Sequence, residues 1–295
     1  MHYYYLVMIL ATPLYMAVLF SSFKWSERRR RARWPFKTSD RLRRAAGESL
    51  KRRYQELSEA ISLELVFGMI GAVIIVLLGP PIGKLLHQTL VSEIVSMAAG
   101  VIFVSAFSSW RILRKVRQRS NLRLGWFGER YTAERLEKLQ QEGYLVFHDV
   151  PCDGAQGPFN LDHVVLGPNG IFVVETKTRR KLKGEKGDKN HEVSFDGERL
   201  LWPWGADKHG VEQARAEAKW LRHIIRESLG EDVPVAPILA LPGWYVHEKR
   251  VPGFRVVNPG YLGDVILKWP NPPLSSDLRS RIAALLETRV RDVED

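Results

Sequence analysis

Two carboxylates and an ammonium group stand at the ends of one apolar hairpin. In NLDHVVLGPNGIFVVETK, residues 160–177, two apolar runs flank a Gly-Pro-Asn-Gly turn, and Asp162, Glu175 and Lys177 lie at the ends. Side chains alternate between the two faces of a strand, so Glu175 and Lys177 emerge on the same face. A hairpin that turns at residues 167–170 places Asp162 opposite Glu175. The three side chains should therefore meet at one edge of the hairpin.

Such a group of side chains suits the hydrolysis of a phosphodiester. Adjacent carboxylates repel each other unless a proton or a cation lies between them. Mg²⁺ binds one or two carboxylates and leaves positions for water and phosphate, and Mn²⁺ is the alternative ion. An ammonium group such as that of Lys177 can orient or deprotonate a metal-bound water, or balance the charge that develops at phosphorus.

The spacing of these residues also has a plainer interpretation. An acidic residue two positions before a lysine is common, and Glu217-Ala-Lys219 repeats the pattern within an expected helix, where we expect no partner acid. On spacing alone, a solvated salt-bridge cluster at the hairpin edge is favoured over a metal site. His163 is expected on the opposite strand face from Asp162, packed or bound to backbone rather than catalytic.

The sequence around the hairpin resembles a known family. The stretches WFGERYTAERL, YLVFHDV and NLDHVVLGPNGIFVVETK, followed by VEQARAEAKWL, are together similar to the nuclease-related domain, NERD. That family is assigned to the PD-(D/E)xK nuclease superfamily. The resemblance covers about residues 125–240 and is strongest over 125–177. The combined pattern is far more specific than any one of its parts.

The resemblance implies a role for each of five residues. Asp162 and Glu175 would ligate the metal ion, and Lys177 would act on the attacking water. Glu129, in the first helix of the domain, would complete the acidic cluster or assist a second ion. Gln213 would orient water or a backbone phosphate. All of the acidic and lysine positions of the motif are present, so the resemblance implies an intact site.

Other side chains are weaker candidates for contact with nucleic acid. The phosphate backbone could be held by basic residues after the hairpin, although a solvated loop explains them equally well; these residues are Arg179, Arg180, Lys181 and Lys183. Stacking on bases is one use of tryptophan, but packing is the commoner use, and we favour packing for Trp202, Trp204 and Trp220.

The elements that must position these residues alternate between helices and strands. We expect a helix ending near Gly143, a strand at 144–150, the hairpin, a second hairpin at 191–202, a helix at 207–230, strands at 233–241 and 254–258, and helices near 260–268 and 275–291. This order predicts an α/β domain, a mixed sheet flanked by helices, which the resemblance identifies as restriction-endonuclease-like. The single Cys152 excludes an internal disulfide and a zinc site built from several cysteines.

The net charge of +11 belongs to the N-terminal part of the chain. Residues 1–124 hold 20 Lys and Arg against 7 Asp and Glu, a net charge of +13, and residues 125–295 have a net charge of −2. Three apolar stretches, 3–23, 65–83 and 94–110, can cross a membrane as helices. Positive charge follows the first stretch instead of preceding it, which favours a retained anchor over a cleaved signal peptide.

The positive charges predict one membrane topology. Residues 24–53 hold 13 Lys and Arg and residues 111–123 hold six, whereas the connection between the second and third spans has only Lys84. The positive-inside rule places the N-terminus outside an inner or plasma membrane and the C-terminal domain in the cytoplasm. The divisions are a span (1–23), a basic loop with an amphipathic helix that suits anionic lipids (24–64), two spans (65–110), a basic linker (111–124) and the nuclease-like domain (125–295).

The sequence thus predicts a membrane-anchored, metal-dependent nuclease that cleaves DNA, with RNA less favoured. Two alternatives stay open. The same fold can bind nucleic acid with little or no turnover, or the domain can act as a membrane scaffold for a protein partner. The slightly negative domain offers no general attraction to DNA, which keeps both alternatives in view.

Overall fold

The structure is a computed structural model that describes residues 43–87, 89–154, 157–182 and 189–291, together with residues 18, 21, 22 and 25. Almost all of the first expected span, and most of the basic segment that follows it, lies outside the described residues. The chain divides into two compact units. The first comprises Met1–Arg41, Glu59–Val116 and Val293–Asp295, and the second comprises Leu42–Ser58 and Arg117–Asp292.

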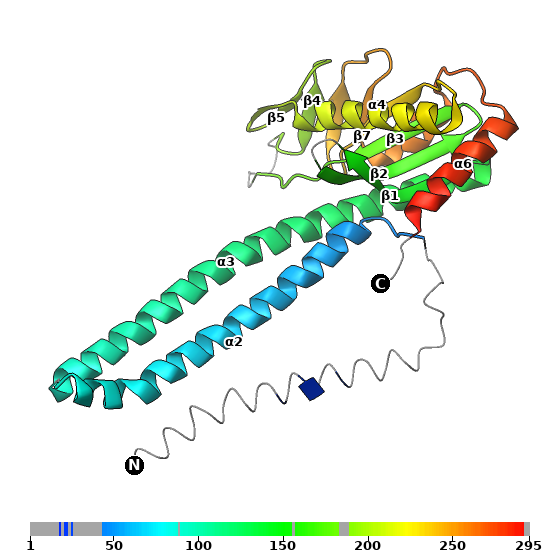
Figure 1. Cartoon of the computed structure of the whole chain (residues 1–295). Helices are drawn as coiled ribbons and strands as arrows, with labels where there is room; N and C mark the ends of the chain where they lie inside the picture. The colour runs from blue at the N-terminus through cyan, green and yellow to red at the C-terminus, as the bar shows by residue number, and fades with distance from the viewer. Residues whose placement is uncertain are drawn as a thin grey trace. The chain divides into compact units, whose positions relative to one another are not determined.

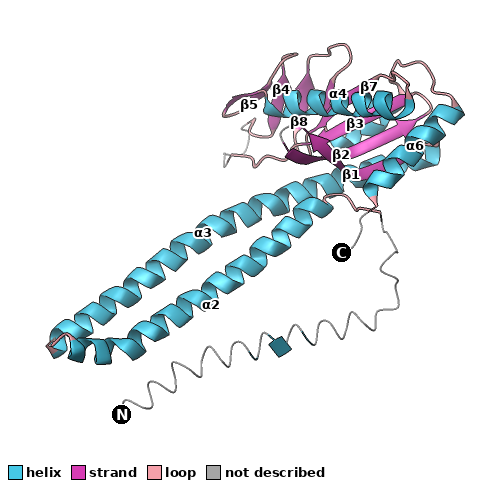
Figure 2. Ribbon diagram, in the orientation of Figure 1, coloured by secondary structure: helices cyan, strands magenta, loops and turns pink. Residues whose placement is uncertain are grey.

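Two long helices, α2 (Glu48–Leu85) and α3 (Leu90–Leu136), run through the N-terminal half of the chain (Figures 1 and 2). Both are long and apolar enough to cross a membrane, and they contain the second and third spans predicted from the sequence. Large apolar side chains in these stretches are mostly exposed, at 67% for Phe67 and 71% for Phe103. Exposed apolar surface of this extent is typical of a surface that contacts lipid or a partner.

Within the first unit, small residues allow the two helices to approach closely. A Cβ atom at Gly68 would lie 2.8 Å from the hydroxyl oxygen of Ser108, and one at Gly79 would collide with Met97. Close contact at glycines is common between membrane helices, which gain no hydrophobic energy from each other. Glu64, before the apolar part of α2, accepts ion pairs of 2.7 Å from Arg111 and Lys115, which neutralise its charge.

Two segments expected as separate pieces are instead parts of these helices. The amphipathic helix expected within residues 24–64 is described from Glu48 onward, and it continues without a break into the second span. The basic linker, residues 111–124, is part of α3. Its sequence, RILRKVRQRSNLRL, contains no Gly or Pro and is rich in Arg and Leu, so nothing in it ends a helix.

The second unit is built around a mixed sheet with strand order β1-β2-β3-β7-β9. β1 (Leu145–Gly154), β2 (Gly157–Gly167) and β3 (Gly170–Thr176) form an antiparallel meander, and β7 (Val235–Ala240) and β9 (Arg255–Val257) join it in parallel. The β2–β3 hairpin turns between Gly167 and Gly170, where the Gly-Pro-Asn-Gly sequence predicts a turn. The mixed sheet expected from the order of elements is confirmed.

A second sheet was not predicted. Its order is β6-β5-β4-β8, from β4 (Glu192–Phe195), β5 (Leu200–Trp202), β6 (Gly205–Asp207) and β8 (Tyr245–Glu248). The hairpin expected at 191–202 supplies only β4 and β5, so the prediction of a single sheet is wrong. β8 was missed because its sequence, Tyr-Val-His-Glu, is short and only partly apolar, and it therefore gives a weak periodic signal.

Helices cover both faces of the mixed sheet. α4 (His209–Leu229) and α6 (Ser276–Val290) pack with the strands on one face, where Val164 and Val173 meet Leu221 and Leu286. On the other face, residues of β2, β3 and β7 pack with the end of α3 and with η1 (Glu137–Glu142). The same residues also pack with α5 (Leu262–Leu267), a short helix that follows η2 (Pro259–Tyr261). β3 is buried along its whole length. The sheet therefore holds the end of the β2–β3 hairpin in a rigid setting.

Residues 42–58, before the apolar part of α2, belong to the second unit. The Arg44 side chain is buried and forms an ion pair of 3.0 Å with Asp149 of β1. The same carboxylate accepts hydrogen bonds from the Ser49 backbone N–H, at 3.0 Å, and from the Asn160 side chain, at 2.9 Å. A polar network of this kind is costly to break, because each buried charge needs its partner.

Replacing Arg44 with methionine should lower the free energy of unfolding by about 2 kcal/mol, because Asp149 would stay buried without its cation. Thermal unfolding of the full chain in detergent would measure the change. Arg43→Met is the matched control, because Arg43 bonds Glu287 with a side chain that is 55% exposed, and such pairs contribute less than about 1 kcal/mol. Equal losses in the two variants would contradict the prediction.

Candidate active site

The end of the β2–β3 hairpin brings Asp162 and Glu175 together. His163 pairs with Val174, and the same register, continued by one residue, places Asp162 across from Glu175. The Asp162 carboxylate accepts a hydrogen bond of 2.8 Å from the backbone N–H of Thr176, next to Glu175. The juxtaposition predicted from the turn is therefore present, and a backbone hydrogen bond fixes one of its two carboxylates.

Lys177 joins this pair through two short contacts. Its ammonium group lies 2.6 Å from Glu175 Oε1 and donates a hydrogen bond of 2.7 Å to the Gln213 side-chain oxygen. Gln213 belongs to α4, so the helix and the hairpin converge on the lysine. The Glu175 side chain is only 2% exposed and that of Lys177 19% exposed. A solvated salt-bridge cluster, the interpretation favoured by spacing alone, is therefore wrong.

Glu217, for which no partner acid was expected, also belongs to this cluster. It is 3% exposed, and its Oε1 accepts a hydrogen bond of 2.8 Å from the Gln213 amide. It also lies close enough to Glu175 for their charges to interact, so the expectation that Glu217 has no partner acid is wrong. Its position four residues after Gln213, on the same helix face, was a signal that could have identified it.

The buried carboxyls of the cluster are ready to take up a proton or a cation. Burial, together with the charge of Glu175, raises the pKa of Glu217 to about 10. Burial, together with the charges of Glu175 and Glu129, also raises the pKa of Asp162 well above its usual range. One oxygen of Glu175 and one of Glu217 are buried without a hydrogen-bond donor among the described residues. Carboxylate oxygens in this state suit a bound cation.

Glu129 and Asp149 extend the acidic surroundings of the site. Glu129, on α3, is buried, and burial followed by the charges of Asp149 and Glu175 raises its pKa to about 8. Asp149 was not singled out from the sequence, because its place in the fold depends on Arg44, more than one hundred residues earlier in the chain. Glu129 therefore lies close enough to the hairpin carboxylates for their charges to interact.

The Lys177 ammonium group is held in its charged form. Burial by itself lowers the pKa of Lys177, but the charge of Glu175, the hydrogen bond to it and the charge of Asp162 raise the pKa by more. A lysine in this state donates hydrogen bonds and balances negative charge. Of the three uses predicted for Lys177, orienting a water molecule and balancing negative charge fit better than deprotonating the water.

The donor set fits a hard divalent ion. Asp162 and Glu175 supply two carboxylates, which is the number that Mg²⁺ uses when water and phosphate complete its coordination. Within the described ranges, no three His, Cys, Asp or Glu side chains are grouped as a metal site. A site here would therefore depend on water or substrate for its remaining ligands, which is usual for a catalytic ion and unusual for a structural one.

The weaker candidates for contact with nucleic acid have separate positions. Arg179 forms an ion pair of 3.5 Å with Asp207, and Arg180 donates a hydrogen bond of 2.8 Å to Ser120. Lys181 is exposed, and its ammonium group lies 5.8 Å from the centre of a Trp244 ring. Lys183 lies outside the described residues. The three described side chains follow the site along the chain and are not part of its hydrogen-bond network.

His163 is buried on the other face of β2, as predicted. Its Nδ1 lies 2.9 Å from Nδ1 of His148 on β1, and the two rings meet edge to face. Burial lowers the pKa of His148 to about 4, and burial with the neighbouring His148 lowers the pKa of His163 well below its usual range. The pair is therefore neutral and structural, and it bonds side chain to side chain rather than to backbone.

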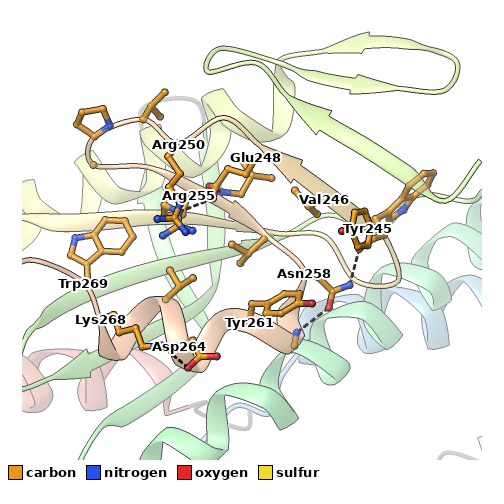
Figure 3. Close-up of a pocket in the computed structure, with 18 of the residues that line it drawn as sticks. Tyr245, Val246, Glu248, Arg250, Arg255, Asn258, Tyr261, Asp264, Lys268 and Trp269 are labelled. Carbon is orange, nitrogen blue, oxygen red and sulfur yellow. Dashed lines mark hydrogen bonds and ion pairs between the residues drawn. The ribbon is translucent and has the colours of Figure 1, made fainter. Parts of the chain in front are cut away.

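A groove of about 1420 Å³ lies elsewhere in the second unit, beside β8, β9 and α5 (Figure 3). Among its charged side chains, Arg255 is paired with Glu248 at 2.8 Å and Lys268 with Asp264 at 3.3 Å. Its described lining includes none of the hairpin site residues. The candidate active site is therefore recognised by its buried carboxyls and lysine, whose charges interact, rather than by its volume.

Comparison with known families agrees with the resemblance found in the sequence. Residues 124–242, less than half of the chain, match the family model of the nuclease-related domain, NERD. The range contains every residue of the hairpin site and the part of α4 that carries Gln213 and Glu217. The suspected family is thus confirmed for this part of the chain. A search of curated proteins finds no match to it.

Proposed function

We propose that the nuclease-related domain at residues 124–242 is a PD-(D/E)xK-type nuclease that hydrolyses phosphodiester bonds with the help of Mg²⁺ or Mn²⁺. The observation that carries this proposal is the convergence of Asp162, the buried Glu175 and Lys177 at one end of the hairpin, where Lys177 pairs with Glu175 and Asp162 accepts a hydrogen bond from the adjacent backbone. Buried like charges lower the stability of a protein, so they are usually found where function requires them. Groups with shifted pKa values of this kind are typical of catalytic sites.

In this proposal, each side chain has a distinct task. Asp162 and Glu175 would hold the ion, which when bound lowers the pKa of water and withdraws charge from the phosphate. Lys177, charged and held by Gln213, orients the attacking water and stabilises negative charge at the phosphate oxygens. Glu129, with its pKa of about 8, completes the acidic cluster and can exchange a proton near neutral pH.

The proposed substrate is DNA, with RNA as the less favoured alternative. The net charge of −2 over residues 125–295 gives no general attraction to a polyanion. Attraction must therefore be local, from exposed basic side chains such as Arg180 and Lys181 just beyond the site. The basic residues before and after the apolar helices can add to it or can bind anionic lipid headgroups.

We also propose that the chain is an integral membrane protein. The two apolar helices support this, and the sequence adds a third span near the N-terminus. The distribution of Lys and Arg places the N-terminus outside and the nuclease-related domain in the cytoplasm. An anchor of this kind would restrict cleavage to nucleic acid near an inner or plasma membrane.

Replacing Asp162 with asparagine should reduce cleavage at least about 100-fold and weaken Mg²⁺ binding, because the amide keeps the size of the side chain but removes its charge. The full chain in detergent would be incubated with linear and circular DNA and with RNA, in Mg²⁺, in Mn²⁺ or in EDTA. The full chain is needed because Arg44 and Ser49 complete the fold of the domain.

Asp153→Asn is the control for this prediction, since Asp153 is an exposed aspartate on the adjacent strand β1. Cleavage that survives in Asp162→Asn would contradict the proposed site. Tight nucleic-acid binding without cleavage by the unsubstituted chain would favour the binding-module alternative. If the chain neither cleaves nor binds nucleic acid, a scaffold for a protein partner becomes the better explanation.

A further inference from the structure

Three tryptophans gather on the second sheet and its flank. The rings of Trp202 and Trp204 are parallel, with centres 5.3 Å apart and planes 6° apart. Trp244 meets both edge to face, with centres 4.8 Å and 5.5 Å away. Trp202 and Trp244 are buried, at 6% and 1% exposure, but Trp204 is 44% exposed. Both Trp202 and Trp204 therefore pack as favoured from the sequence, but Trp204 also keeps a large part of its surface exposed.

Trp204 has the properties of a fixed stacking surface. Its indole stacks against Trp202 and also contacts Trp244, yet the residue is still 44% exposed. The contacts with Trp202 and Trp244 hold the ring in place before any ligand arrives, which reduces the entropy that a ligand would lose on binding.

Two structural links connect Trp204 with the candidate active site. Asp207, three residues after Trp204, forms an ion pair with Arg179, which follows Lys177 by two residues. Asp207 also accepts a hydrogen bond of 2.8 Å from the backbone N–H of His209, at the start of the helix that carries Gln213. The segment that follows Trp204 is therefore linked through Asp207 to the residues just after Lys177 and to the start of α4, which carries Gln213.

The basic residues that follow the site along the chain include one that contacts a tryptophan of this cluster. Lys181 is exposed, and its ammonium group lies 5.8 Å from the Trp244 ring. Arg180, its neighbour, is also exposed. A basic segment beside an aromatic ring is the combination by which proteins bind single strands, since the cations hold phosphates and the ring stacks on a base.

From this arrangement we propose that Trp204 stacks on an unpaired nucleobase of the substrate, so that the domain acts on nucleic acid with a single-stranded segment. This inference rests on the proposed nuclease function and names its substrate class. Bases inside a duplex are stacked on each other, and their faces are not accessible to a protein ring. A fixed indole beside the site would therefore favour a flap, an overhang, a gap or a free strand over a continuous duplex.

The test is binding of labelled oligonucleotides to the full chain in detergent, measured by fluorescence anisotropy in EDTA so that no cleavage occurs. The probes are single strands of oligothymidylate and oligouridylate of about 15 nucleotides, a duplex of equal length and an abasic strand of equal length. Trp204→Ala should weaken binding of the two single strands about tenfold, within a range of roughly 5- to 100-fold. Trp204→Phe, which keeps an aromatic face, should restore most of the affinity.

Two controls separate stacking from damage to the domain. The affinity for the abasic strand and the salt dependence of binding should be the same in Trp204→Ala and in the unsubstituted chain, because the phosphate contacts are unchanged. Tyr261→Ala removes another exposed aromatic ring of the second unit, 62% exposed, and should leave the affinity for single strands unchanged. The thymidine and uridine probes show whether the stacked base comes from DNA or RNA.

Several results would overturn the inference. Unchanged affinity for single strands in Trp204→Ala would do so, as would an equal loss for the abasic strand, or duplex binding as tight as single-strand binding. Failure of the nuclease proposal is recognised separately. If the unsubstituted chain cleaves nothing with Mg²⁺ but loses single-strand affinity on Trp204→Ala, the stacking site stands and the catalytic proposal fails. If the unsubstituted chain cleaves with Mg²⁺ and Trp204→Ala does not change the affinities, the catalytic proposal stands and the stacking site fails.

Discussion

Replacing Lys177 with methionine should slow phosphodiester cleavage by a factor on the order of 10² to 10⁴ and leave divalent-ion binding in place. The ammonium group is the one side-chain donor that contacts both Glu175 and Gln213 among the described residues. Its loss removes the positive charge beside the phosphate but leaves both proposed metal ligands. Cleavage rates at saturating Mg²⁺, together with calorimetric titration of the ion, would separate these two effects.

Methionine is the appropriate replacement because the stem of the lysine is packed. A Cβ atom at Gly210, in the first turn of α4, would lie 3.2 Å from Lys177 Cγ, so a branched side chain has little room there. Methionine is unbranched and preserves the apolar contact of the stem. Effects on the rate can then be attributed to the ammonium group rather than to a displaced helix.

Lys219→Met is the matched control for Lys177→Met. Lys219 stands two residues after an acidic residue, as Lys177 does, but it is exposed on α4. Its loss should change the rate less than about threefold, since exposed charges contribute little. A similar loss of rate in both variants, or cleavage by Lys177→Met within a few fold of the unsubstituted chain, would remove Lys177 from the proposed mechanism.

The part of the site that could be predicted is the part held together by local structure. The Gly-Pro-Asn-Gly turn fixes the register of the β2–β3 hairpin, and the register alone places Asp162 opposite Glu175. The alternation of side chains along β3 then places Lys177 on the same face as Glu175. These inferences need only residues 160–177, so they do not require knowledge of contacts distant in the chain.

Glu217 and Asp149 depend on contacts that are distant in the chain. Glu217 reaches Glu175 because α4 packs against β3 and β7, and the rotation of that helix is set by apolar side chains such as Leu221 and Ile225. Asp149 is held by Arg44, which precedes the apolar helices. A pattern of acidic residues cannot reveal such partners until the packing of the sheet and its helices is known.

The elements were predicted better than their connections. Most helices and strands of the second unit lie within a few residues of their expected positions, because their apolar periodicity is strong. The second sheet was missed because all four of its strands have only three or four residues and β8 is far from the others in sequence. The continuity of α3 was missed because a change from apolar to basic residues looks like a boundary but does not interrupt a helix.

The metal-free protein should become less stable as the pH rises from 7 to 9. In the folded chain the pKa of Glu129 is about 8 and that of Glu217 about 10, whereas both carboxyls have an ordinary pKa of 4.5. Between pH 4.5 and these values, the folded chain holds protons that the unfolded chain has released. The contribution of these two groups to the free energy of unfolding is therefore largest below pH 4.5. This contribution is lost as the pH rises through their folded pKa values.

The window from pH 7 to 9 isolates this effect from the buried histidines. The pKa values of His148 and His163 are lowered in the folded chain, so these residues act in the opposite direction, but only below the ordinary histidine pKa of 6.5. Above pH 7, each of the two carboxyls should lower the free energy of unfolding by about 1 kcal/mol per pH unit. Of these two groups, both contribute up to pH 8 and only Glu217 contributes above it.

Thermal unfolding of the full chain in detergent and EDTA at several pH values would measure the slope. Glu217→Gln should flatten it above pH 8, because glutamine keeps the hydrogen-bonding shape of a protonated carboxyl and does not titrate. Millimolar Mg²⁺ should also reduce the slope, since an ion bound to the neighbouring carboxylates replaces the protons and stabilises the charged cluster. If the slope is equal in Glu217→Gln and in the unsubstituted chain, Glu217 is not the group that holds a proton in the folded state. If Mg²⁺ leaves the slope unchanged, there is no cation site at the hairpin.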